Sequence, residues 1–196
     1  MLARSRPETR GRALLGLLHW VKLQHGTSGL RRLRERSLGP TNGLLAHHIA
    51  SDAWYAYPDF AALLRTIDAE FGDGDLELCR DIGRWAGSTD MRSVLDGSLR
   101  DATPQRMVHA ARMVWPLYYR RAGRLETVRS DPDDTRIRIR GFDAMDPAHC
   151  RLMEGWLMGV MEALGCVVAE GSREILCASH GDPYHEFAGT WTMRRR

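Results

Sequence analysis

The hydrophobic period of the sequence changes once, near residue 125, and this change limits the folds that the chain can adopt. Before it, apolar residues recur at helical spacing in several segments that glycine and proline separate. After it, residues 125–130 and 135–140 alternate in polarity and are joined by Asp-Pro-Asp-Asp, which predicts a β-hairpin. In the second arm isoleucines alternate with arginines, so one face should be buried and the other wet.

A long helix and further strands are expected after the hairpin. Asp146-Pro147 begins a predicted helix that runs to residue 164 and carries a strong apolar stripe. Gly155 and Gly159 on this helix have the spacing that allows a neighbour to pack closely. Strands are predicted at 167–170, 173–178 and 186–192. Helices followed by a hairpin, a helix and more strands predict an α+β protein, with an N-terminal helical layer and an antiparallel sheet.

The helical layer should contain several short helices. They are predicted at 11–24, 27–36, 42–49, 60–71, 75–85, from Ser88 onward, and at 104–121. Gly26 is a natural stop for the first helix, and residues 52–58 read as an irregular connector. Residues 1–10, which are arginine-rich and contain Pro7, are expected to be a flexible arm. With no linker or repeat beyond it, 11–193 is expected to be a single domain.

Composition narrows the classes of partner. The first fifty residues are basic, centred on Arg31, Arg32, Arg34 and Arg36, but no helix-turn-helix or zinc-finger spacing accompanies them, so no nucleic-acid partner is expected. The longest apolar run, 13–21, is too short to span a bilayer and lacks the pattern of a signal peptide, so no membrane partner and a cytoplasmic location are expected. In that compartment the 4 cysteines should be reduced thiols or metal ligands.

Four residues of the C-terminal part could bind a metal: Cys150, Glu174, Cys177 and His185. Cys177 and His185 flank a Gly-Asp-Pro turn that could fold both side chains back to one point. Glu174 and Cys177 lie an odd number of residues apart, so a bulge or a strand end must bring them to one face. Spacing alone favours a different reading, in which two cysteines are buried, the glutamate lies on the surface and the histidine is exposed in a turn.

The sequence offers pocket residues but no catalytic group. His109, Trp115 and Tyr118 lie on the predicted 104–121 helix and are candidates to line a ligand pocket. His109 could alternatively be a haem ligand. Phosphate-binding loops and nucleophile elbows are missing from the sequence, and Cys177 has no evident orienting group to form a catalytic unit with a histidine. A binding protein is therefore expected rather than an enzyme.

The segment from 174 to 187, with Cys150 ahead of it, resembles the 4-vinyl-reductase domain. The matching residues are Glu174, Cys177, Gly181, Pro183, His185 and Phe187. In the related sensor domains of phenol-responsive bacterial regulators, a Cys, Glu, Cys, Cys set holds a structural zinc beside a pocket for aromatic effectors. The resemblance thus implies zinc at the four candidate residues. His185 stands where those sensors have a cysteine, which is an exchange that zinc accepts.

A wider resemblance covers most of the chain after residue 50. The run GDGDLELCRDIGRWA at 72–86, residues 115–119 and the ending GDPYHEF look like a family of uncharacterised bacterial proteins, abundant in myxobacteria. That family is related to 4-vinyl-reductase and haem-nitric-oxide-binding domains. The Tyr-x-Ser-x-Arg signature of the haem-nitric-oxide family is missing from this sequence, which counts against haem.

The resemblance implies a sensory domain of a bacterial regulatory system. Such a domain would bind a small hydrophobic ligand and act through a homodimer or a separate signalling partner. Two alternatives stay open. One is an enzyme of tetrapyrrole metabolism similar to a vinyl reductase, for which no nicotinamide or flavin motif is seen. The other is a structural protein-interaction module resembling the vesicle-tethering proteins that share this fold.

Overall fold

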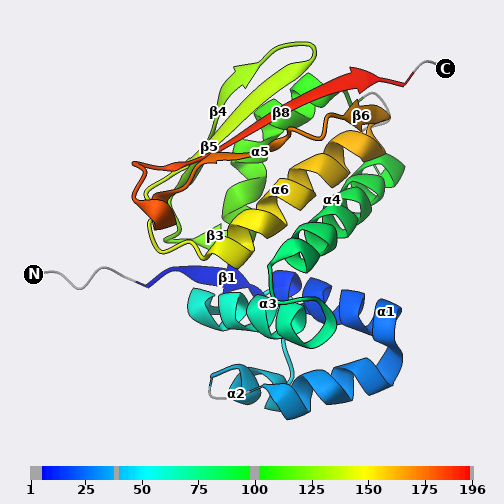
Figure 1. Cartoon of the computed structure of the whole chain (residues 1–196), viewed down its shortest axis with the longest axis vertical. Helices are drawn as coiled ribbons and strands as arrows, with labels where there is room; N and C mark the ends of the chain where they lie inside the picture. Colours follow the sequence, from blue (N-terminus) through cyan, green and yellow to red (C-terminus); the bar gives the residue numbers. More distant parts are fainter. Residues whose placement is uncertain (1–5, 38–39, 98–101, 195–196) are drawn as a thin grey trace, which may run out of the picture.

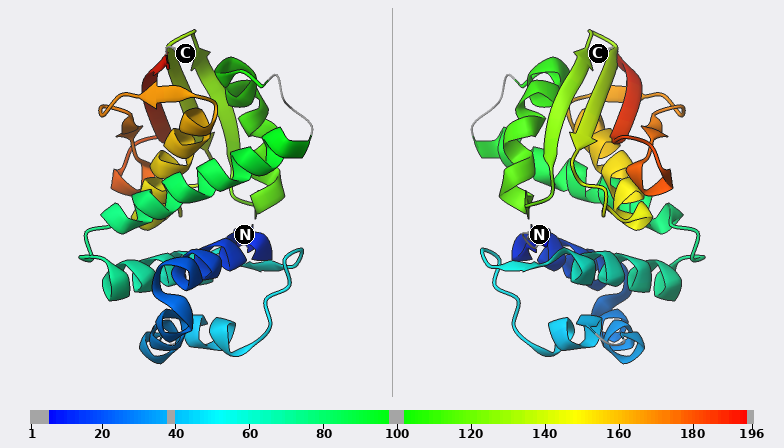
Figure 2. Two further views of the ribbon diagram at one scale, coloured as in Figure 1. Left: turned by 90° about the vertical axis from the view of Figure 1, so that its right-hand side faces the viewer. Right: turned by 90° about the vertical axis from the view of Figure 1, so that its left-hand side faces the viewer.

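The computed structural model describes residues 6–37, 40–97 and 102–194 and confirms the α+β class (Figure 1). Its helices are α1 (Gly11–Arg36), α2 (Pro40–Ala46), α3 (Tyr57–Phe71), α4 (Glu77–Gly97), α5 (Pro104–Tyr118) and α6 (Pro147–Ala163). Figure 2 shows α1, α2 and α3 as a lower layer, with α4, α5, α6 and the larger sheet above it. None of the described helices is both long and apolar enough to cross a bilayer.

The strands form two antiparallel sheets. The small sheet has the order β2-β1-β3 and consists of β1 (Glu8–Arg10), β2 (Trp54–Ala56) and β3 (Tyr119–Arg120). The larger sheet contains the hairpin β4 (Arg124–Ser130) and β5 (Asp134–Arg140), followed by β6 (Cys166–Val168), β7 (Arg173–Leu176) and β8 (His185–Met193). β8 pairs with β5, β6 and β7, so the last strand connects the others. A 3-10 turn, Ala178–His180, lies between β7 and β8.

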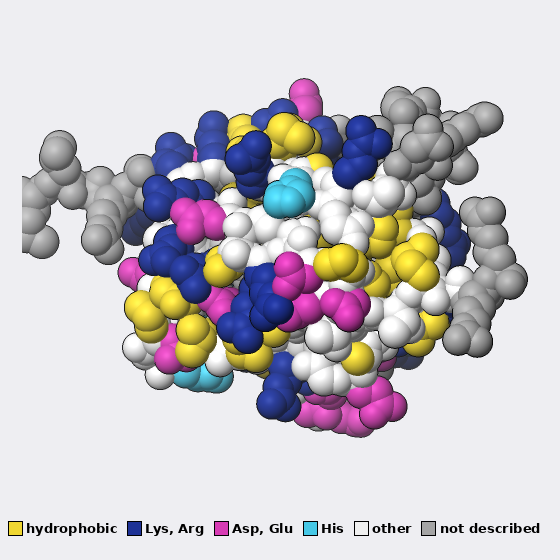
Figure 3. Space-filling model, turned by 90° about the horizontal axis from the view of Figure 1, so that it is seen from above, with side chains coloured by type: hydrophobic (Ala, Val, Ile, Leu, Met, Phe, Trp, Pro, Cys, Tyr) yellow, Lys and Arg dark blue, Asp and Glu magenta, His cyan; other side chains and the backbone are white. Residues whose placement is uncertain are grey.

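The predicted alternation of the hairpin is confirmed. Ile137 and Ile139 of β5 are buried in the core, while Arg138 lies on the opposite face. There Arg138 forms an ion pair with the buried Glu186 of β8 at 2.5 Å, and its guanidinium lies over the Tyr184 ring. Basic and acidic side chains are interspersed on the face seen from above (Figure 3), so that face carries no continuous basic stripe.

The beginning of the chain differs from the expectation of a flexible arm. Residues 8–10 form β1, and Thr9 of this strand is fully buried. Glu8 forms ion pairs with Arg120 and Arg121, which fix β1 against β3. The expected irregular connector likewise contains β2, because residues 54–56 pair with β1. Residues 1–5 of the expected arm lie outside the described residues.

Two helix boundaries show how glycine acts in different surroundings. Gly26 has φ 65° and ψ −164° inside α1, so the helix kinks at the residue where a stop was predicted. By contrast α4 continues through residues 86–88, where a break between two helices was expected. Gly87 faces the backbone of Trp156 on α6. Its lack of a side chain therefore allows close helix packing and does not mark a turn.

The closest helix pair of the structure is α4 against α6, which lie side by side in Figure 1. Gly83 and Gly87 of α4 face the backbone of α6, and Gly155 and Gly159 of α6 face the backbone of α4. A Cβ atom at any of these positions would lie closer to a backbone oxygen than real Cβ contacts do. The prediction of a close neighbour at Gly155 and Gly159 is confirmed, and this contact places the start of α6 beside the larger sheet.

Candidate functional site

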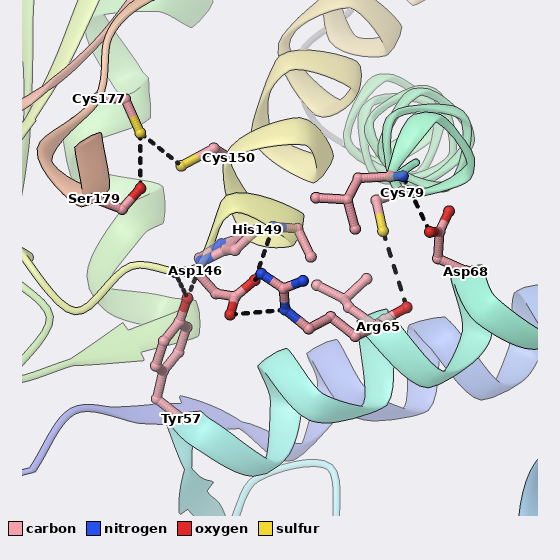
Figure 4. Close-up of polar contacts among 12 residues, drawn as sticks. Tyr57, Arg65, Asp68, Cys79, Asp146, His149, Cys150, Cys177 and Ser179 are labelled. Atoms are coloured by element: carbon pink, nitrogen blue, oxygen red, sulfur yellow. Dashed lines mark hydrogen bonds and ion pairs between the residues drawn. The ribbon is translucent and has the colours of Figure 1, made fainter. Parts of the chain in front are cut away.

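The four predicted metal-binding residues come together in space. Cys150, Glu174, Cys177 and His185 each offer one ligand atom, and these atoms all lie within 4.8 Å of one another. The Cys150 sulfur is 3.9 Å from the Cys177 sulfur and 3.5 Å from Nδ1 of His185. Figure 4 shows Cys150 on α6 pointing toward Cys177 beyond the end of β7. The alternative reading, with Glu174 and His185 separate at the surface, is wrong, because His185 is completely buried and contacts Glu174.

Local structure explains how residues from three elements converge. Cys150 lies in the first turn of α6, where the Asp146 side chain caps the helix by accepting the Ala148 N–H. β7 shifts register between Glu174 and Leu176 and then ends, which removes the parity conflict between Glu174 and Cys177. His185 is the first residue of β8 and therefore lies beside the end of β7.

The surrounding hydrogen bonds orient the donor atoms. Nε2 of His185 is 3.3 Å from the Phe142 carbonyl oxygen, and Nδ1 is 2.8 Å from Oε1 of Glu174. Each ring nitrogen therefore faces an acceptor, but a neutral imidazole has only one N–H to donate. With the proton on Nε2, the short contact between Nδ1 and Glu174 needs a cation. A bound metal ion would satisfy both, together with the two sulfur atoms.

The electrostatics of the cluster also favour a cation. Burial raises the pKa of the Cys150 thiol far above its ordinary value, and the Glu174 carboxylate and Cys177 raise it further. Without a positive charge, Cys150 is therefore held as a neutral thiol. A divalent ion reverses this effect because it stabilises thiolate, as metal sites do generally.

A second feature is a cavity of about 120 Å³ between α1, α4, α5 and α6. Its wall is largely apolar, and it includes the aromatic rings of Phe60, Trp85, Trp115, Tyr118, Tyr119 and Trp156. At its edge the Asp90 carboxylate accepts hydrogen bonds from the Tyr118 hydroxyl at 3.2 Å and from Nε1 of Trp156 at 3.0 Å. An open hollow between α1 and α4 shares Gly16, Trp85, Ala86 and Asp90 with the cavity, so these residues lie at its entrance.

The structure separates the three predicted pocket residues. Trp115 and Tyr118 line the cavity, but His109 is exposed and does not. Val108, Ala111 and Trp115 form the buried face of α5. His109 directly follows Val108, so its side chain is rotated by about 100° around the helix and points away from that face. Sequence reasoning missed Asp90 as a pocket residue. A polar residue on a helix is usually exposed to solvent, and the sequence does not show that this one faces a cavity.

Sequence reasoning also missed the buried His149, which lies next to Cys150. Its Nδ1 is 3.2 Å from the Tyr57 hydroxyl, which in turn accepts the Asp146 N–H at 2.8 Å (Figure 4). Its Nε2 has no hydrogen-bond partner among the described residues. Burial lowers the pKa of His149 to about 3, so the imidazole is neutral.

Comparison with known proteins gives a fold but no close relative. The sequence matches no family model, and no curated protein matches it. Solved structures do match: an H-NOX protein from S. oneidensis in the Fe(II) ligation state has a TM-score of 0.70 at 14% identity, covering 95% of this chain and 98% of that one. The chain has the H-NOX fold. An H-NOX protein from K. algicida has a TM-score of 0.67 at 13% identity, covering 95% and 98%.

These structures correct the cofactor prediction. The sequence favoured zinc and counted against haem, but the solved proteins with this fold are named in Fe(II), Fe(II)NO and Fe(II)CO ligation states. A further structure with the fold, at 8% identity, was solved to probe the function of heme distortion in the H-NOX family. Iron and haem, rather than zinc, are therefore what the named relatives of this fold contain. The fold also bears out the resemblance to haem-nitric-oxide-binding domains, while the resemblance to the 4-vinyl-reductase domain stays a prediction.

The residues of this chain meet only part of what a haem requires. The neutral His149, with its unpartnered Nε2, has the chemistry of an axial ligand. However, its ring is enclosed by the rings of Tyr119, Phe60, Trp115 and Phe142 at centroid distances of 4.8, 5.3, 6.1 and 6.2 Å. The neighbouring cavity of about 120 Å³ is also below the roughly 300 Å³ at which pockets for larger ligands begin. A porphyrin does not fit this arrangement of side chains.

Proposed function

We propose that the protein is a sensory domain that binds a small, largely apolar molecule in the cavity between α1, α4, α5 and α6. The observation that carries the proposal is the aromatic lining of this cavity, which includes the predicted Trp115 and Tyr118. An apolar cavity of about 150 Å³ is known to accept benzene, so about 120 Å³ suits a ligand no larger than a single ring. A pocket of this kind favours a ligand-binding domain over a purely structural interaction module.

The fold supports the sensory part of the proposal. H-NOX proteins from S. oneidensis with this fold have been solved in Fe(II)NO and Fe(II)CO states, so these proteins bind small diatomic molecules. In this chain the ligand would occupy the aromatic cavity itself. Occupancy would be transmitted to a second copy or to a separate signalling partner, in a bacterial regulatory system of the cytoplasm. The four cysteines are free and buried, which agrees with a reducing compartment.

We also propose that Cys150, Glu174, Cys177 and His185 hold a divalent metal ion with a structural role. The donors come from the start of α6, from β7 and its end, and from the start of β8. A metal bound there would fasten two strands of the larger sheet to the helix that packs on it. The convergence of the four ligand atoms within 4.8 Å of one another, with Nδ1 of His185 only 2.8 Å from Oε1 of Glu174, supports this proposal.

Titration with toluene tests the ligand proposal. Toluene should quench or shift the fluorescence of the tryptophans that line the cavity, with saturable binding. Gly16→Leu should abolish this binding, because a Cβ at Gly16 meets no atom within 4 Å and the longer side chain can fill the cavity.

Gly43→Leu is the matched control. Position 43 is also open, but it lies on α2 away from the cavity, so toluene binding should persist. Titration with haemin, followed by the Soret absorption, is run beside it. Toluene binding that is absent, or that survives Gly16→Leu, contradicts the proposal, and a stoichiometric haem complex would replace it with a haem-based sensor.

A further inference from the structure

The entrance of the cavity carries a carboxylate, that of Asp90, which forms no ion pair with the described residues. Oδ2 of Asp90 accepts both protein hydrogen bonds, from Tyr118 and from Trp156, and these fix the orientation of the carboxylate. Oδ1 accepts no hydrogen bond from the described residues and forms no ion pair with them. Asp90 also lines both the cavity and the open hollow between α1 and α4, so it lies where the two meet.

Among the described residues that line the cavity, the one basic side chain is Arg12, and it makes no direct ion pair with Asp90. Arg12 is exposed, and its guanidinium lies 5.9 Å from the centre of the Tyr118 ring. Within the described part of the chain no ion pair joins Arg12 to Asp90. Next to this negative charge stand the rings of Trp85, Tyr118 and Trp156. Tyr118 and Trp156 present their polar edges to the carboxylate. A carboxylate at the mouth of a cavity that aromatic side chains line attracts an organic cation whose apolar part can enter the cavity.

We infer that the cavity selects a small arylalkyl amine, with the ring among the aromatic side chains and the ammonium group on Oδ1 of Asp90. The inference rests on the proposed function and specifies its ligand class. The size of the cavity limits the enclosed part to about one ring. The ammonium group would lie at the entrance, and a longer substituent on the amine would extend into the hollow lined by His19 and Lys22. Lys22 there disfavours a second positive charge on the ligand.

The test compares three probes that share a ring but differ in charge: benzylamine, toluene and benzoate. Benzylamine is protonated at neutral pH, as a lysine side chain is. It should bind at least about tenfold more tightly than toluene, because a charge-assisted hydrogen bond is added. Benzoate should bind more weakly than toluene. Calorimetry or tryptophan fluorescence gives the three affinities with the unaltered protein.

Asp90→Asn then assigns the preference to the carboxylate. The amide oxygen can still accept from Tyr118 and Trp156, so the fold and toluene binding should be retained, while the advantage of benzylamine falls by about tenfold. Arg12→Gln should strengthen benzylamine binding, since it removes a nearby like charge. Circular dichroism and the melting temperature check that both variants are folded.

The outcomes separate the two levels of the proposal. If toluene binds and benzylamine binds no more tightly, the inference is wrong and the proposed function stands. If benzoate binds most tightly, Arg12 rather than Asp90 determines the ligand, and the inference is again wrong. If none of the probes binds, the proposed function fails and the inference with it. Because these results need only the unaltered chain, a variant that misfolds does not remove the test.

Discussion

At the scale of single residues, the contacts of His185 hold its imidazole ring in an orientation suited to metal binding. It is fully buried, with Nε2 3.3 Å from the Phe142 carbonyl oxygen and Nδ1 facing Glu174 and Cys150. Glu174 is itself held by a hydrogen bond from its N–H to Oε1 of the buried Glu154 at 2.7 Å. Such outer contacts keep ligand atoms in place before a metal arrives, which reduces the entropy that binding must overcome.

Cys150→Ser should weaken metal binding by more than about 100-fold, because outer partners alone contribute 10- to 100-fold and a lost thiolate ligand costs more. Cobalt(II) is a suitable probe, since its thiolate complexes absorb in the near ultraviolet and its tetrahedral sites in the visible. Cys166→Ser is the control, because Cys166 is also buried but lies outside the cluster. Equal cobalt affinity in the two variants would contradict the metal proposal.

Tyr57→Phe should reduce the free energy of unfolding by about 2 kcal/mol, because the lost hydroxyl leaves two buried groups unpaired. These groups are the Asp146 N–H at the start of α6 and Nδ1 of His149. Denaturant unfolding measures the change. Tyr184→Phe is the control, because the Tyr184 hydroxyl has no hydrogen-bond partner among the described residues. If this substitution destabilises the protein as much as Tyr57→Phe does, the loss of buried hydrogen bonds is not the cause of the effect.

At the scale of elements, the contact between α4 and α6 holds the site and the cavity in one frame. α6 carries Cys150 near its start and the cavity residue Trp156 two turns later, while α4 carries Trp85 and Asp90. The backbones approach closely because glycines face each other across the contact. A shift between these two helices would therefore move both walls of the cavity.

Gly155→Ala should destabilise the protein by about 3 kcal/mol or more, because the added methyl group collides with the Arg80 carbonyl of α4. Chemical denaturation provides the measurement. Gly43→Ala, on an open position of α2, should instead be neutral or stabilise by up to about 1 kcal/mol. Similar effects of the two substitutions would show that α4 and α6 are less closely packed than the structure indicates.

The sequence predicted those elements whose formation depends on residues that are close together in the chain. The α6 helix and the hairpin follow from periodicity and from turn residues, which act over a few positions. Gly26 was correctly identified as an interruption, but it was expected to end the helix and instead kinks it. Residues 8–10 pair with residues 54–56 and 119–120, which are distant in the sequence. The short sequence of β1 does not indicate these partners, so this small sheet could not be predicted. The continuation of α4 through Gly87 has the same origin, because the reason for that glycine lies on α6.

The candidate site shows the same division. The four metal-binding candidates were grouped by a resemblance to a family pattern, whereas spacing alone favoured separate positions; the structure brings their ligand atoms together. The aromatic cavity was predictable only at Trp115 and Tyr118. Asp90 and Trp156 meet there because α4 and α6 come from opposite sides of the hairpin in sequence, and only the fold brings them together.

At the scale of the whole molecule, a ligand or metal that binds only the folded chain must raise its stability. Benzylamine or toluene at about 100 times its dissociation constant should add about 2.7 kcal/mol. For a chain of 196 residues this corresponds to a rise in melting temperature of roughly 5–10 °C. Differential scanning calorimetry checks the shift, and Gly16→Leu, whose cavity is filled, should show none. A shift of equal size in that variant would place the ligand elsewhere.

The position of β8 has a consequence for how the chain is made. This strand, residues 185–193, pairs with β5, β6 and β7 and supplies His185. A ribosome synthesises it after all the strands that depend on it, so the hairpin and the helices can assemble early while the larger sheet must wait. Until then, the edges of β5 and β7 stay open. The nascent chain is therefore exposed to edge-to-edge pairing with other chains until β8 has left the exit tunnel.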